Sequence, residues 1–148
     1  MNPKNLENEP LGRMFAHTAK MHRDLLRRLA HKNGLEHGQP IALAVISANE
    51  GISQRQLSEK LFITPASATS LLQKMERSGL VERKPDPNDQ RAFCIYLTQR
   101  GHLVDKQMKK GLKEIENACL KNFSQCDIEE FRRLLSKFHN NLYEILNG

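Results

Sequence analysis

Two helix-start signals lie close together in the middle of the chain, and they constrain its fold more than any other feature. Ser53 precedes Gln56 by three residues, the spacing of a capping box in which each residue satisfies a free backbone N–H group. Thr64 is followed by Pro65, a hydroxyl cap and then the residue best tolerated at the first helical position. Gly79 is a typical end for the second helix. The segment therefore predicts two short helices joined by a tight turn.

Two short β-prone runs follow these helices, at 81–84 and 92–97. The link at 85–90 is rich in Pro, Asp and Asn, and we predict that it is too long for a tight hairpin. Two capped helices followed by a pair of strands is the order of a winged helix-turn-helix, whose second helix enters the major groove of DNA. The expected fold class is mainly α with a small β-wing.

The second helix is predicted to have one buried face and one small polar face. Apolar residues from Ala68 to Met75 follow the helical spacing i, i+3, i+4, i+7, which turns short hydroxyl, methyl and amide side chains outward. Such side chains can approach base edges closely, whereas solvated helix faces are usually rich in Glu and Lys. The alternative is that they are merely capping residues. The predicted DNA-binding set in this region is Ser53, Arg55, Thr64, Ala66, Ser67, Thr69, Ser70, Gln73, Lys74, Arg77 and Lys84.

The part of the chain at 53–101 resembles the MarR (multiple antibiotic resistance regulator) family. The resemblance rests on the run MERSGLVERKPDPNDQR and on the wing signature, in which DQR is separated from LT by five residues. It implies that Arg91 inserts into the minor groove, where the negative potential attracts a guanidinium, and that Asp89 holds Arg91 in place. The alternative roles are a turn former for Asp89 and an exposed ion-pair partner for Arg91.

Apolar stripes recur outside this segment, in helices predicted at about 10–32 and beyond Thr98. A lone winged domain would leave these stripes exposed, and the resemblance implies a homodimer built from the first helix and the last two. We predict one domain over 1–148, with dimerisation helices at about 10–35 and 99–148 and a DNA-binding part at about 40–98. A two-fold dimer implies double-stranded DNA with a palindromic operator.

The composition agrees with a DNA-binding role. A net charge of +6 favours a polyanionic partner. No apolar run approaches the ~18 residues of a membrane span, and the first residues lack a secretory signal, so we expect a cytoplasmic protein with no membrane contact. No P-loop, GxSxG or paired-carboxylate motif is present, so an enzyme is not expected. The rival class is a winged-helix module that binds proteins and has no specific DNA binding.

The resemblance also implies an effector, a small amphipathic or phenolic molecule bound between the dimer helices and the winged part. Its pocket would be lined by Phe15, His22, Ile46 and Met108, although each residue is more often simply part of a core. We expect the protein to be a repressor that such an effector releases from DNA. No cofactor is expected.

Oxidant sensing is a second possibility. One branch of the family uses a cysteine in the first helix, where this chain has none. Cys119 and Cys126 flank the expected bend between the last two helices and could pair if their Cα atoms lie within ~7 Å, but inert buried thiols are the alternative. The histidines show no HxxxH or HExxH spacing, so no metal is expected.

Overall fold

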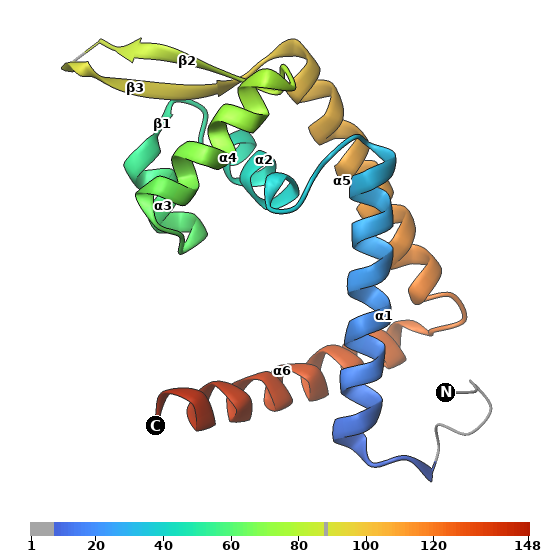
Figure 1. Ribbon diagram of the computed structural model, residues 1–148. Helices are drawn as coiled ribbons and strands as arrows, with labels where there is room; N and C mark the ends of the chain where they lie inside the picture. Colours follow the sequence, from blue (N-terminus) through green and yellow to red (C-terminus); the bar gives the residue numbers. More distant parts are fainter. Residues whose placement is uncertain (1–7, 88) are drawn as a thin grey trace. The chain divides into compact units, whose positions relative to one another are not determined.

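The computed structural model describes residues 8–148 apart from residue 88, and gives only the backbone of residues 89–91 (Figure 1). The chain is mainly helical with one small antiparallel sheet, so the predicted fold class is confirmed. The elements are α1 (Leu11–Lys32), α2 (Gln39–Ala48), β1 (Ile52–Ser53), α3 (Gln54–Leu61), α4 (Pro65–Arg77), β2 (Val81–Asp86), β3 (Asp89–Leu97), α5 (Gln99–Cys119) and α6 (Gln125–Asn147).

The two capping signals start α3 and α4 as predicted. Ser53 Oγ accepts a hydrogen bond from the Gln56 backbone N–H at 3.2 Å, and Gln56 Oε1 accepts one from Ser53 N at 3.0 Å. Thr64 Oγ1 accepts from the backbone N–H of Ser67 at 3.1 Å. These local bonds satisfy donors that a helix start otherwise leaves free, which is why sequence spacing alone located both helices.

The end of α4 is also set by local hydrogen bonds, at the predicted stop Gly79. Gly79 has a φ of +66°, a left-handed conformation that costs glycine little. Its N–H donates to the Glu76 carbonyl at 2.8 Å, and the Leu80 N–H donates to the Met75 carbonyl at 2.9 Å. This pair of bonds is a Schellman motif, and it turns the chain from α4 directly into β2.

The sheet has the strand order β1–β3–β2 and corrects two predictions. The short strand β1 was not predicted; it pairs with β3, with Ile52 opposite Ile95. The link in the wing is much shorter than predicted, because Asp86 pairs opposite Asp89. The sheet tolerates Pro85 because β2 is an edge strand, where a missing N–H on the free side costs nothing, and a register shift between Pro85 and Asp86 brings the strand ends together.

The core lies under α4 and joins every element from the end of α1 to the first half of α5. The core holds the buried face of α4, so only the opposite, exposed face of this helix can contact a ligand. The largest fully buried side chains are those of Leu43, Ile46, Leu57, Leu72, Met75, Leu80 and Ile95, with Gln39 as the polar member.

The start of α5 packs tightly on the turn that follows α4. Thr98 Oγ1 donates to the Gly79 carbonyl at 2.5 Å and accepts from the Gly101 N–H at 3.0 Å. A Cβ atom at Gly101 would collide with the backbone carbonyl oxygen of Leu80. A glycine at this position therefore allows the helix to approach the wing root.

The chain divides into two compact units, one ending at Leu112 and one spanning Lys113–Gly148. In the second unit the rings of Phe123 and Phe131 meet edge to face, with centroids 6.1 Å apart, and a capping box of Ser124 and Asp127 starts α6. No residue of α6 is buried, and most of its large apolar side chains are exposed. Within the described residues, no helix is both long and apolar enough to cross a membrane.

Candidate nucleic-acid interface

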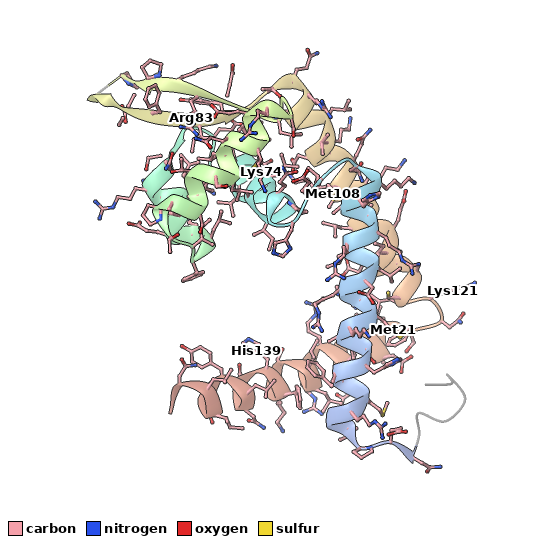
Figure 2. All side chains as sticks on the ribbon, viewed as in Figure 1. Met21, Lys74, Arg83, Met108, Lys121 and His139 are labelled. Atoms are coloured by element: carbon pink, nitrogen blue, oxygen red, sulfur yellow. The ribbon has the colours of Figure 1, made fainter. Side chains whose placement is uncertain are left out.

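The two faces of α4 lie as the sequence predicts. Ala68, Leu72 and Met75 are buried in the core, and the half-buried Leu71 packs against it. The opposite side presents short polar and basic side chains to solvent, and Figure 2 marks Lys74 on this helix. The exposed residues on it are Ala66, Ser67, Ser70, Gln73, Lys74 and Arg77. No acidic residue is among these exposed positions, and Ala66, Ser67 and Ser70 are small enough to approach a groove wall closely.

Thr69 differs from its neighbours because its hydroxyl is already engaged. The side chain is half-buried; its Oγ1 accepts from Gln54 Nε2 at 2.6 Å and donates to the Pro65 carbonyl at 2.9 Å. The first bond joins α3 to α4. In this geometry Thr69 holds the two helices in register, and only its methyl group is left to contact a ligand.

Ser53 and Thr64 have capping roles in the structure. Both hydroxyls accept backbone N–H bonds at helix starts, and Thr64 Oγ1 also donates to Ser67 Oγ at 2.9 Å. A hydroxyl in this role can still contact a phosphate, but its orientation is set by the helix. Ser53 therefore fixes the start of α3, and Thr64 fixes the start of α4.

Two of the cations predicted to bind DNA carry acidic partners. Arg55 Nε lies 3.0 Å from Glu59 Oε1, with both side chains exposed. Lys84 Nζ lies 2.8 Å from Glu82 Oε1 and 4.9 Å from the centre of the Tyr96 ring. The hydrogen bond and charge of Glu82 raise the pKa of Lys84. Either cation would have to exchange a carboxylate for a phosphate, and exposed pairs exchange at little cost.

The predicted wing residues Asp89 and Arg91 belong to β3, but their side chains lie outside the described part of the structure. Their backbone is placed at the far end of the ribbon formed by β2 and β3, beyond the short strand β1 (Figure 1). Their roles remain predictions from the resemblance.

Sequence reasoning missed an ion pair between α4 and the wing. Arg83 Nη2 lies 3.1 Å from Glu76 Oε2, and both side chains are half-buried. Arg83 lies where the ribbon meets α4 (Figure 2). The alternation of β2 could have identified Arg83 as facing the same way as the buried Val81, since residues two apart share a face.

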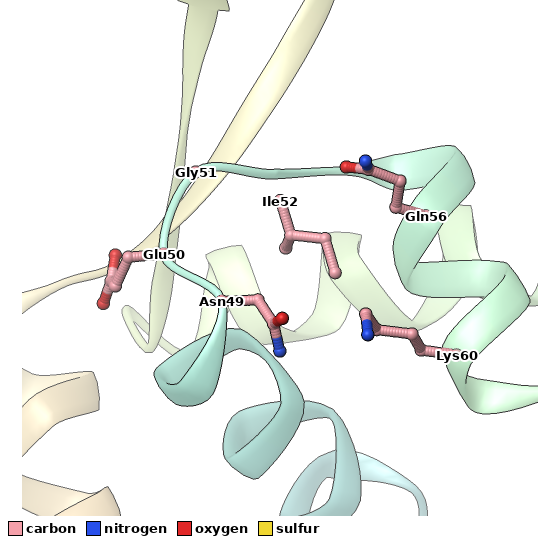
Figure 3. Close-up of a pocket in the computed structure, with 6 residues that line it drawn as sticks. All are labelled: Asn49, Glu50, Gly51, Ile52, Gln56 and Lys60. Carbon is pink, nitrogen blue, oxygen red and sulfur yellow. The ribbon is translucent and has the colours of Figure 1, made fainter.

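The four predicted effector residues differ in burial, and neither of the two hollows described next is lined by them. Ile46 and Met108 are buried members of the core, whereas Phe15 and His22 are exposed on α1. One hollow of about 230 Å³ lies where α2 ends and α3 passes it, lined by Asn49, Glu50, Gly51, Ile52, Gln56 and Lys60 (Figure 3). A second hollow of about 330 Å³ is lined by Arg27, Arg28, His31 and Lys32.

The cysteines are all free thiols. Cys119 and Cys126 are exposed, so inert burial does not describe either of them. Cys94 in β3 is buried, and burial together with the nearby Asp86 carboxylate raises its pKa, which makes its thiolate rare at neutral pH. No group of three or more His, Cys, Asp or Glu residues that could hold a metal occurs in the described part of the chain.

Comparisons with known proteins agree with this geometry. The family model described as "MarR family" matches residues 33–92. The HTH-type transcriptional regulator BilQ of Clostridioides difficile is 26% identical, over 94% of this chain and 92% of its own. The organic hydroperoxide resistance transcriptional regulator of Bacillus subtilis is 28% identical, over 76% of this chain and 86% of its own.

Solved structures show the same fold. A mutant of S. aureus MepR matches with a TM-score of 0.82 at 20% identity, covering 90% of this chain and 99% of that one. A complex of S. aureus MepR with DNA matches with a TM-score of 0.70 at 25% identity, covering 89% of this chain and 97% of the other.

Proposed function

The chain belongs to the MarR family of transcriptional regulators, and from this premise we propose that it is a dimeric repressor that binds a palindromic operator in duplex DNA. The observation that carries the proposal is the exposed small polar face of α4, held from below by the core and flanked by the ribbon of β2 and β3. In this assignment α4 enters the major groove and the wing reaches the adjacent minor groove.

The residues on α4 divide into two roles. Ser70 and Gln73 offer a hydroxyl and an amide to base edges, and Ala66 can contact a thymine methyl group. Lys74 and Arg77 supply positive charge for phosphates, which gives affinity without sequence information. The caps at Ser53 and Thr64 fix the starts of α3 and α4.

The wing is assigned to the minor groove on the strength of the family signature. Arg91 is the residue that inserts, and Asp89 orients it. The MepR complex with DNA, a fold neighbour of this chain, supports the assignment of the fold to duplex binding.

Dimerisation is supported by the apolar surface that the single chain leaves uncovered. The exposed large apolar side chains on the helices outside the winged part are Leu11, Phe15, Met21, Leu25, Leu103, Leu112, Phe131, Leu134, Leu135, Phe138, Leu142, Tyr143, Ile145 and Leu146. Apolar surface on this scale is typical of subunit interfaces. A two-fold dimer would place two copies of α4 in successive major grooves, about 34–36 Å apart.

The decisive experiment is selection of random duplex DNA on the purified protein, followed by binding of the selected sequence at several salt concentrations. Enrichment of a palindrome is expected, with affinity falling steeply as salt rises because phosphate contacts release counterions. Arg91→Ala should weaken binding to the operator. Substitution of Ser70 or Gln73 should change the free energy by which one base is preferred over another, by ~1–3 kcal/mol at one position of a half-site.

Lys106→Ala, an exposed substitution on α5, is the control and should leave binding unchanged. Failure of any sequence to enrich would contradict the proposal and favour a winged-helix module that binds protein. Equal operator affinity of Arg91→Ala and the wild type would contradict the wing assignment.

Release from DNA is proposed to depend on a small amphipathic effector. Oxidation is a second candidate signal, favoured by the exposed thiols of Cys119 and Cys126 on either side of the α5–α6 connection. Adding peroxide to the operator complex separates the two signals. Release that is lost in Cys119→Ser and Cys126→Ser would establish oxidant sensing, and release that is unaffected by these substitutions would exclude both cysteines.

A further inference from the structure

We propose that the Glu76–Arg83 ion pair fixes the angle between α4 and the wing, so that both can contact DNA at once. Glu76 and Arg83 are positioning residues in this proposal, since neither is assigned a contact with DNA. The inference rests on the proposed function for its consequence, but the angle itself is a property of the free protein.

The pair is shielded from water more than exposed ion pairs of this chain. The side chains of Arg83 and Glu76 are 25% and 33% exposed, compared with 88% and 61% for Arg55 and Glu59. Salt and solvent screen an exposed pair strongly and a shielded pair less. The attraction between Glu76 and Arg83 is therefore weakened little by solvent, and it can hold β2 against α4.

Arg83 is held in an environment that costs free energy. Its Nε and Nη2 atoms are buried and have no hydrogen-bond partner within the described residues, so the 3.1 Å approach to Glu76 is an ion pair and not an aligned hydrogen bond. A buried N–H group without an acceptor is unfavourable, because it has lost its hydrogen bonds to water. A buried guanidinium with unpaired N–H groups adds little to the stability of a fold. The better explanation for Arg83 is that its ion pair orients β2 relative to α4.

The ion pair joins α4 to β2 close to the turn that connects them, where the angle between the helix and the wing is set. Glu76 lies on α4 between the exposed residues Gln73 and Arg77. Arg83 lies on β2, an edge strand that has β3 on one side only. The root of β2 is fixed in the core by Val81, and Arg83 is the next residue on the same face.

A small change of angle at Arg83 becomes a large displacement at the wing tip. Asp86, the end of β2, lies three residues farther along, about 10 Å at ~3.3 Å per residue. A tilt of about 10° would then move the tip by about 2 Å, several times the ~0.5 Å tolerance of a preorganised contact.

The first test measures the free protein. Residual dipolar couplings give the orientation of the β2–β3 ribbon relative to α4 in Glu76→Gln, in Arg83→Met and in the reversed pair Glu76→Arg with Arg83→Glu. We expect a change of about 10° in both single variants and recovery in the reversed pair. Glu82→Gln, on the other face of the same strand, is the control. An unchanged orientation in both single variants would overturn the proposal.

The second test is hydroxyl-radical footprinting on the selected operator. Single variants should lose protection of the backbone sugars along the flanking minor groove and keep protection of the sugars that border the central half-site. Uniform loss of both footprints would mean that the pair only stabilises the fold, and would overturn the positioning role. If the wild-type protein gives no footprint, the proposed function is wrong, and the ribbon orientation alone decides whether the pair fixes the wing. Glu76→Gln is nearly isosteric and keeps the test available if Arg83→Met does not fold.

Discussion

Asp105 on α5 accepts a hydrogen bond from the hydroxyl of Ser47 on α2, with 2.7 Å between the oxygens and 58 positions between the residues. The same carboxylate oxygen lies 2.6 Å from Lys109 Nζ, and Lys109 also reaches Ser47 Oγ at 3.1 Å. The Asp105 side chain is only 10% exposed. This three-residue cluster fixes α5 to the winged part through polar contacts, beside the apolar core.

Asp105→Ala is expected to lower the free energy of unfolding by about 1–3 kcal/mol, because it removes two short charge-assisted hydrogen bonds from a shielded site. Lys109→Ala should cost less than about 1 kcal/mol, since this side chain is 64% exposed and exposed charges contribute little. Urea denaturation of the two variants measures the difference. Equal losses would mean that the carboxylate is not the centre of the cluster.

Two glycines of α5 should respond differently to the same substitution. A Cβ at Gly101 would overlap the backbone carbonyl of Leu80, which cannot move aside, whereas at Gly111 it would meet the terminal methyl groups of Leu29, which can rotate. Overpacking against backbone typically costs 1–3 kcal/mol, and alanine in a helix regains about 1 kcal/mol. Gly101→Ala should therefore lower the thermal midpoint clearly, and Gly111→Ala should change it little; the reverse order would contradict this packing.

Phe62 in the turn between α3 and α4 is expected to tolerate replacement. It has a φ of +53° and the residue is 96% exposed. Its ring therefore gains almost nothing from packing, while its backbone occupies the left-handed region that disfavours most residues. Phe62→Asn should raise the free energy of unfolding by up to about 1 kcal/mol, since asparagine adopts this conformation more readily. Phe62→Val, whose branched Cβ fits it badly, should lower stability. Chemical denaturation that ranked valine above asparagine would contradict this explanation.

The features that sequence reasoning predicted correctly depend on neighbours within one helical turn. The caps at Ser53 and Thr64 and the stop at Gly79 are of this kind. The exposed and buried faces of α4 follow from periodicity alone. Each of these signals is complete in a few consecutive residues, so no knowledge of the rest of the fold is needed.

The features that it missed depend on distant parts of the chain. The strand β1 has only two residues and exists because β3 pairs with it from more than forty positions away. The role of the shielded Asp105 becomes clear only from its hydrogen bond with the distant Ser47. The role of Arg83 likewise becomes clear only from its ion pair with Glu76. The short wing link was mispredicted because its prolines and aspartates resemble a loop, although an edge strand can carry them.

Asp127 provides a pH-dependent test of the second unit. The Ser124 hydroxyl donates to Asp127 Oδ2 at 2.7 Å and the Ser124 backbone N–H at 2.8 Å, and these bonds lower the pKa of Asp127. A carboxyl group whose pKa is lower in the folded state stabilises that state above the ordinary pKa of aspartate, and this contribution is lost as the pH falls through the folded value. The start of α6 should therefore fray in acid before the rest of the helix, as the amide signals of its first turn would report.

The Ser124→Ala variant separates this effect from general acid unfolding. Removing the hydroxyl takes away the larger of the two causes, so the pKa of Asp127 should rise toward its ordinary range in a carboxyl-carbon NMR titration. Glu130 is the matched control on the same helix, because its pKa is lowered by a hydrogen bond from Arg133 that Ser124→Ala leaves intact. If Asp127 titrated identically in both proteins, the capping box would not be the source of its acidity. If Glu130 shifted as well, the variant would have disturbed the whole helix.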